Sequence, residues 1–132
     1  MALLTEEMKE LFREQNMYHL ATANARGIPN VIPLRCVKIY DDETILICDN
    51  YFNKTLENMR ENPAAAICIW KPKHGYQIKG RVEIHEKGEI FEYNLAWMKG
   101  FKPDAKPKTA ILFRITEIYS LDPGENAGER IV

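Results

Sequence analysis

The sequence predicts a small, mainly β protein with helices inserted between some of its strands. Short runs of β-branched and apolar residues recur along the chain, and tight turns join several of them. Helical segments do not alternate regularly with these runs, which argues against a parallel sheet. We therefore expect about six antiparallel strands in one small barrel. The chain of 132 residues forms a single domain in this interpretation, over residues 1–132.

An amphipathic helix is predicted at the N-terminus, within residues 1–16. Met8, Leu11 and Phe12 recur at helical spacing, acidic residues occupy the first turn, and Thr5 has the residue type of an N-cap. The stretch lacks the cleavage site of a signal peptide, and no apolar run in the chain is long enough to cross a bilayer. We therefore expect a cytoplasmic protein without a membrane partner.

The expected strands are apolar runs that end at turn-forming residues. The clearest is "YQIKGRVEIH", in which apolar side chains and one glycine alternate with polar side chains. The run "NVIPLRCVKIY" is apolar on both faces, and together with "DDE" and "TILICDN" it predicts a hairpin. The expected strands are residues 17–24, 30–40, 44–50, 64–71, 76–85 and 108–121.

Two further helices are expected between the strands. The helix "NKTLENMREN" begins with Asn53 as its N-cap and stops before a proline. The helix "KGEIFEYNLAWMKGF" is expected to end at Gly100. The polar tail 122–132, rich in proline and glycine, is expected to be loose or docked as an irregular arm.

Composition argues against several kinds of partner. The 18 basic and 19 acidic residues leave a net charge of −1, so no overall field favours nucleic acid, and any anion site must be local. Cys36, Cys48 and Cys68 lack the spacing of a metal site, and we expect free buried thiols rather than a metal or a disulfide. Because several strands are apolar on both faces, a second subunit is the expected cover, and we expect a homodimer.

A candidate anion site lies at the start of the second helix. With Asn53 as N-cap, Lys54 and Thr55 occupy the first two helical positions, where backbone N–H groups have no intrahelical partner. The lysine adds a full positive charge and the threonine adds a hydroxyl donor, which together suit a phosphate. The same residues also suit an ordinary capped helix with a solvated lysine, and local sequence alone favours that interpretation.

The strand before this helix carries two unusual residues. Pro33 cannot donate a hydrogen bond to a neighbouring strand, so it indicates an edge strand or a bulge, and bulges often lie beside ligands. Arg35 shares a face with Val31 and Val37, which predicts a partly buried guanidinium. Such a group needs an anionic or planar partner, either a ligand or a neighbouring acid.

Together, "NVIPLRCVKIYDDETILICDNYFNKTLENMRENPAAAICIW" resembles the FMN-binding split-barrel family related to pyridoxamine 5'-phosphate oxidase. The resemblance extends from about "MYHLATAN" to "RITEIY", and its most specific part is the hairpin followed by the "NKT" helix. It implies a dimeric Greek-key split barrel of six strands, with FMN at the subunit interface. It also implies a flavoprotein that is a small oxidoreductase or an electron carrier, whose chemistry is the flavin's own.

Residue by residue, the resemblance implies a set of cofactor contacts. Lys54 and Thr55 would hold the phosphate, and residues 33–36 would line the isoalloxazine, largely through backbone groups. A flat apolar ring needs a flat packing surface, which Trp97 or Trp70 of either chain would supply. The implied cofactor-binding residues are Pro33, Leu34, Arg35, Cys36, Asn50, Asn53, Lys54, Thr55 and Trp97.

The sequence also departs from the vitamin B6 oxidases of this family. Those enzymes have a C-terminal segment that helps bind the substrate, and "LDPGENAGERIV" does not match it, so pyridoxamine-phosphate oxidase activity is not expected. Their phosphate loop carries a basic pair where this chain has a single lysine. No catalytic residue is assigned, because Tyr51, Lys38 and His19 have no partner visible in the sequence.

Two other classes of function stay open at this point. Split-barrel relatives include binders of haem and of deazaflavin, so the protein could be a carrier or sensor without turnover. A nucleic-acid-binding β-barrel would need a basic groove with exposed aromatic residues. Lys79 and Arg81 share one face of a strand, but Glu83 follows on that face, and this interpretation is the weaker one.

Overall fold

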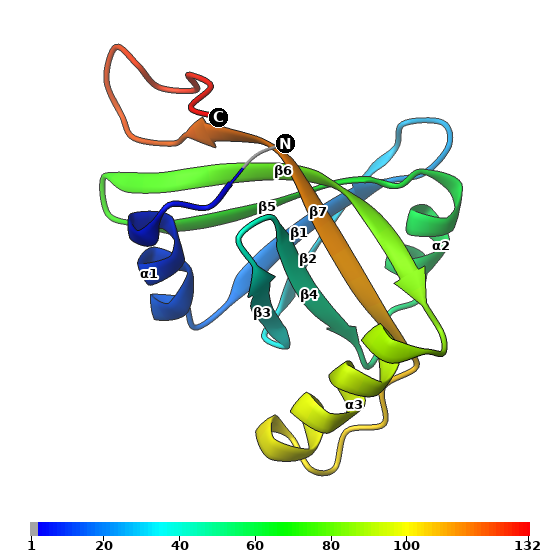
Figure 1. The fold of residues 1–132 in the computed structure, drawn as a ribbon. Coiled ribbons are helices and arrows are strands. Elements are labelled where there is room, and N and C mark those ends of the chain that lie inside the picture. The colour runs from blue at the N-terminus through cyan, green and yellow to red at the C-terminus, as the bar shows by residue number, and fades with distance from the viewer. Residues whose placement is uncertain (1–2) are drawn as a thin grey trace.

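The computed structural model describes residues 3–132, which form one curled antiparallel sheet with three helices (Figure 1). The predicted mainly β class is confirmed. The strand order across the sheet is β2-β1-β5-β6-β7-β4-β3. The elements are α1 (Glu6–Glu14), β1 (Tyr18–Ala23), β2 (Pro29–Leu34), β3 (Val37–Asp41), β4 (Thr44–Asp49), α2 (Lys54–Glu61), β5 (Ala64–Lys71), β6 (His74–His85), α3 (Glu89–Phe101) and β7 (Thr109–Ser120).

The described chain has seven strands, so the expected number of six is wrong. The single strand predicted over residues 30–40 is two strands, β2 and β3, which form opposite edges of the sheet. Between them the N–H of Val37 donates to the carbonyl oxygen of Arg35 at 2.9 Å, which turns the chain out of the sheet. Pro33 lies in the edge strand β2, where a residue without an N–H is tolerated.

The core is formed by the sheet together with α1 and α2, which contributes Met59. The apolar side chains Met8, Leu11 and Phe12 of α1 are buried as predicted. Thr5 occupies the N-cap, and its hydroxyl oxygen accepts from the N–H of Met8 at 3.2 Å. The alternation predicted for "YQIKGRVEIH" is confirmed in β6. Its side chains on one face are buried in the core, and those on the other face are more exposed.

One contact in this core leaves no room for a side chain. The pairing of β6 with β7 shifts register between Lys79 and Gly80, and the buried ring of Phe113 lies against the glycine. A Cβ atom at Gly80 would lie 2.3 Å from the carbonyl oxygen of Arg114 and 2.5 Å from Cε1 of Phe113. The two longest strands therefore approach each other closely only because residue 80 is glycine.

The remaining helices and the tail differ in detail from the expectation. Asn53 holds the N-cap position of α2, but its side chain makes no capping hydrogen bond. Gly100 lies inside the last turn of α3 and does not end it, because the helix continues to Phe101. The tail is docked as an irregular arm, since the N–H of Ile131 donates to the carbonyl oxygen of Ile118 at 2.7 Å.

Residues 1–2 of the expected N-terminal segment lie outside the described part of the chain. Within residues 3–132, no helix is long and apolar enough to cross a membrane.

Candidate functional site

A pocket of about 450 Å³ lies where the chain passes from β2 to β3, beside the loop that follows β4. Most of the side chains around it are apolar or aromatic, and two are cationic. The structure therefore brings five of the predicted site residues together, namely those of 33–36 and Asn50. The lining residues are Ile32, Pro33, Leu34, Arg35, Cys36, Cys48, Asn50, Tyr51, Phe52 and Lys102.

The loop on one side of this pocket is held by the fully buried carboxylate of Asp49. Its Oδ1 accepts from the N–H of Phe52 at 2.8 Å, and its Oδ2 accepts from the hydroxyl of Thr109 at 2.9 Å. The backbone carbonyl of Asp49 accepts from the N–H of Lys108 at 2.8 Å. These bonds fix the loop to the start of β7 and so give the pocket a defined wall.

Two cations border the pocket, and they come from distant parts of the chain. Lys102 follows α3, and its ammonium lies 5.0 Å from the ring centroid of Tyr51. Arg35 is exposed, so the expectation of a partly buried guanidinium is wrong, because the chain leaves the sheet at this residue. Within residues 3–132 no carboxylate lies within ion-pair distance of either cation. Both are therefore available to a ligand.

Two thiols and an amide meet at the same pocket. The Nδ2 of Asn50 donates to Sγ of Cys36 at 3.4 Å, and Sγ of Cys48 donates to Oδ1 of Asn50 at 3.5 Å. All three cysteines are free thiols, but only Cys48 is buried, so the expectation of buried thiols is wrong for the half-buried Cys36 and Cys68. Burial raises the pKa of the Cys48 thiol to about 11. Burial also raises the pKa of Cys36, although Lys102 and Arg35 act in the opposite direction.

The start of α2 follows this loop but does not line the pocket. Lys54 is exposed, and within residues 3–132 it makes no ion pair. Thr55 is buried, and its hydroxyl oxygen accepts from Nδ2 of Asn30 at 3.1 Å. Asn53 is exposed. The residues expected to hold a phosphate thus follow the pocket residues directly in the sequence but do not line the pocket. The side chain of Thr55 points toward the sheet.

Trp97 lies in a neighbouring hollow of about 270 Å³, which shares Arg35 with the first pocket. Its ring stacks on Phe101 with centroids 5.8 Å apart. The ammonium of Lys38 lies 5.6 Å from the Trp97 ring centroid and donates to the hydroxyl of Tyr93 at 2.8 Å. The alternative tryptophan at position 70 lines a different hollow, beside the start of the C-terminal arm.

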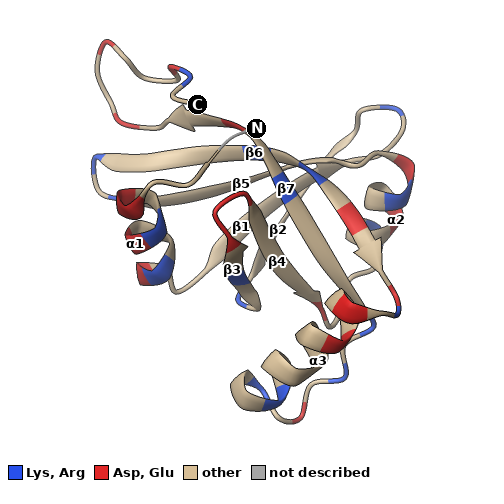
Figure 2. Ribbon diagram, in the orientation of Figure 1, with Lys and Arg blue, Asp and Glu red and all other residues tan. Residues whose placement is uncertain are grey.

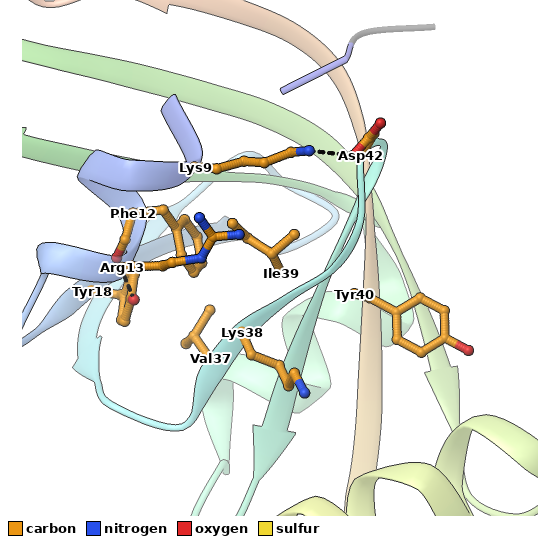
Figure 3. A pocket seen from close by; sticks show the side chains of 9 residues that line it. All are labelled: Lys9, Phe12, Arg13, Tyr18, Val37, Lys38, Ile39, Tyr40 and Asp42. Atoms are coloured by element: carbon orange, nitrogen blue, oxygen red, sulfur yellow. Dashed lines mark hydrogen bonds and ion pairs between the residues drawn. The ribbon is translucent and has the colours of Figure 1, made fainter. Parts of the chain in front are cut away.

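A third hollow, of about 490 Å³, lies between α1 and β3 (Figure 3). An ion pair between Lys9 and Asp42 spans its upper end, and Arg13 points into it. Lys38 lines it but turns its ammonium away, toward Tyr93 of α3. The Trp97 hollow adjoins both this hollow and the first pocket, because it shares Val37 and Lys38 with the one and Arg35 with the other. The lining residues of the third are Lys9, Phe12, Arg13, Tyr18, Val37, Lys38, Ile39, Tyr40 and Asp42.

Charge is otherwise distributed evenly over the molecule. Figure 2 shows basic and acidic residues interspersed on the helices and turns, in keeping with the net charge of −1. On β6 the exposed Arg81 is flanked by Glu83, which pairs with Arg114 of β7. The charge pattern gives no support to a nucleic-acid interface.

The sequence matches the family described as Pyridoxamine 5'-phosphate oxidase over residues 4–122. The chain belongs to this family. A relative from Methanocaldococcus jannaschii, Uncharacterized protein MJ0282, is 43% identical over 131 residues, which is 97% of this chain and 87% of that protein. The crystal structure of HupZ from Group A Streptococcus is 30% identical, with a TM-score of 0.83 over 96% of this chain and all of the other.

More distant members of the same fold bind different ligands, to judge by their names. An FMN-binding protein from Syntrophomonas wolfei is 15% identical, with a TM-score of 0.75 over 87% of this chain and 83% of the other. The heme storage protein HutZ from Vibrio cholerae is 19% identical, with a TM-score of 0.67 over 90% of this chain and 94% of the other. Likeness at this level establishes the split-barrel fold of this chain. It does not identify the ligand, which has to be argued from the residues of the site.

Sequence reasoning did not assign several residues that line the pocket. Cys48, Tyr51 and Phe52 are neighbours of Asn50 in the chain, and this proximity is the signal that could have been used. Lys102 lies far along the chain from the other lining residues. No local pattern indicates it, because the return of the chain after α3 brings it to the pocket.

Proposed function

We propose that this protein binds FMN non-covalently and is a small oxidoreductase or electron carrier. The observation that supports the proposal is the pocket of about 450 Å³, with its apolar walls and two cations that form no ion pair with any of the residues 3–132. Its volume lies in the range of about 300–1,000 Å³ that small-molecule sites occupy. A planar ring with a charged tail matches this combination of apolar surface and positive charge.

The residues around the pocket suit the parts of FMN. Ile32, Leu34 and Phe52 offer apolar contacts to the ring, and the backbone of residues 33–36 offers polar groups at its edge. Arg35 would pair with the phosphate or with the polar edge of the ring. When bound, the isoalloxazine would supply one- and two-electron redox chemistry, which no side chain of the pocket provides.

We propose that the phosphate extends out of the pocket to the start of α2, which does not itself line the pocket. Lys54 would supply the charge and the first N–H groups of the helix would supply donors, with Asn50, Asn53 and Thr55 close by. The hydroxyl of Thr55 already accepts from Asn30, and it retains its own proton to donate.

A second copy of the chain is proposed to complete the site. The edge strand β2 leaves Val31 66% exposed, and Ile28 just before it is 50% exposed. Unpaired apolar edges of this kind require a cover. A homodimer would supply that cover and bring the partner's surface to the pocket that β2 borders.

The visible absorption spectrum of the purified protein tests the ligand. We expect the two bands of an oxidised flavin, or their appearance after FMN is added to colourless protein and free ligand is removed. A single strong Soret band would instead identify haem, and retention of neither ligand would contradict the proposal. Haem is the second candidate, but the pocket presents no histidine, and His74 is hydrogen-bonded to Asp122 at 3.0 Å.

Replacing Lys54 by alanine is expected to weaken FMN far more than riboflavin, because only FMN carries the phosphate. The lost charge-assisted hydrogen bond should cost about 1.5–3 kcal/mol of binding free energy. Isothermal titration with the two ligands measures the difference, and Lys106→Ala serves as control, since this lysine is exposed and does not line the pocket. Equal losses for FMN and riboflavin would place the phosphate elsewhere.

A further inference from the structure

Two cysteines of the pocket lie opposite each other on neighbouring strands. The hairpin pairs Val37 of β3 with Ile47 of β4, so Cys36 and Cys48 are the next residues in register. The N–H of Cys48 donates to the carbonyl oxygen of Cys36 at 2.9 Å. Directly opposed residues of an antiparallel pair have Cα atoms about 4.5–5.5 Å apart and side chains on the same face. That separation falls within the range of about 4.4–6.8 Å found in disulfides.

The contacts of Asn50 show that the two sulfur atoms are on the same side of the hairpin. One amide group meets both, at 3.4 Å from Sγ of Cys36 and 3.5 Å from Sγ of Cys48. Both thiols also line the pocket, so a small reagent that enters the pocket reaches them. Cys68 differs in each respect, because it lies on β5 opposite His19 and does not line this pocket.

The break between β2 and β3 gives Cys36 the freedom that a disulfide would need. Cβ atoms of a disulfide lie about 3.5–4.5 Å apart, slightly closer than in an ordinary cross-strand pair. Cys36 precedes the first residue of β3 and follows the turn at Arg35, so it can move toward Cys48 with little disturbance of the strand.

We propose that Cys36 and Cys48 form a redox-active dithiol, which reacts with a low-molecular-weight disulfide and closes into an intramolecular disulfide. In the first step the Cys36 thiolate attacks one sulfur of the reagent, forms a mixed disulfide and releases one thiolate. In the second step Cys48 loses its proton and attacks Sγ of Cys36, which releases the second thiolate. The protein loses two electrons and two protons, and the reagent is reduced to two thiols.

The charges and burial around the two thiols determine which of them attacks the reagent first. Burial raises the pKa of both thiols, but Lys102 and Arg35 oppose this shift at Cys36, whereas Cys48 is more deeply buried and has a pKa of about 11. The thiolate is the attacking species, so Cys36 reacts first and Cys48 resolves the mixed disulfide. The reaction is therefore expected to be slow at neutral pH and faster as the pH rises. It goes beyond the proposed function and does not require that the pocket binds flavin.

Equilibration of the full-length protein with oxidised glutathione tests the proposal. We expect the number of thiols titrated after denaturation to fall from three to one. A tryptic digest without reductant should then contain peptide 36–38 linked to peptide 39–54, with Cys68 unlinked in peptide 61–73. A linkage through Cys68, or a disulfide between two chains, would overturn the proposal. This measurement needs no substitution, so it decides the question even if a variant fails to fold.

Serine variants test the order of the two steps. Cys48→Ser should stop at the mixed disulfide and retain one glutathione, while Cys36→Ser should react at least about tenfold more slowly than the unmodified protein. Cys68→Ser is the matched control and should form the disulfide at the unmodified rate. If Cys36→Ser takes up glutathione as fast as the unmodified protein, the assignment of Cys36 as the attacking thiol is wrong.

Discussion

Replacing Gly80 by alanine is expected to lower the free energy of unfolding by roughly 3 kcal/mol. The added Cβ would lie 2.3 Å from a backbone oxygen of β7 and 2.5 Å from the ring of Phe113. The backbone contact cannot be relieved by a side-chain rotation, so the pairing of β6 with β7 would have to widen. Urea unfolding followed by circular dichroism measures the loss as a lower midpoint at an unchanged slope.

Gly100→Ala is the matched control for this substitution. Gly100 lies in the last turn of α3, and an added Cβ there would have no heavy atom within 4 Å. Alanine should leave stability unchanged or raise it by up to about 1 kcal/mol, because glycine is the poorer helix former. A similar loss of unfolding free energy in both variants would show that the contact with Phe113 is not what excludes a side chain at residue 80.

Asp49→Ala is expected to cost about 3 kcal/mol or more, since two hydrogen bonds to a carboxylate are lost at about 1.5–3 kcal/mol each. The N–H of Phe52 and the hydroxyl of Thr109 would be left without this acceptor. The loop over residues 50–53 would detach from β7 and the pocket would lose one wall, so FMN affinity should fall together with stability.

Amide hydrogen exchange separates the local effect of Asp49→Ala from a global one. Under conditions where the variant is still folded, the amide of Phe52 should lose its protection while those in the centre of β6 keep theirs. Asp104→Ala is the control, because this aspartate is exposed and should change stability by less than about 0.5 kcal/mol. Retained protection at Phe52 would mean that Asp49 does not hold the loop.

The elements that depend on local sequence were predicted well. The alternation from Tyr76 to Ile84 determines which face of β6 is buried, and Thr5 with its following apolar residues determines α1. The division of residues 30–40 into two strands was not predicted. Both edge strands carry apolar residues on each face, and the turn at Arg35 contains neither glycine nor asparagine, so no local signal marks it.

Only part of the predicted residue set lies around one pocket. Residues 33–36 and Asn50 were assigned through one continuous motif, and the structure places them around one pocket. Lys102 depends on how the chain returns after α3, which no spacing encodes. The exposure of Arg35 also depends on the sheet, because its environment changes where the chain passes from one edge to the other.

The short passage from β2 to β3 also constrains the shape of the whole sheet. Seven strands laid flat would place the two edge strands about 29 Å apart, at about 4.8 Å per strand. The chain from Leu34 to Val37 can span only about 11 Å. The sheet must therefore curl until its two edge strands nearly meet, and residues 35 and 36 form the connection between them. A ligand bound at this connection would stabilise the curvature of the seven-stranded sheet. Extra residues inserted there would let the two edge strands move apart and would open the pocket at the same time.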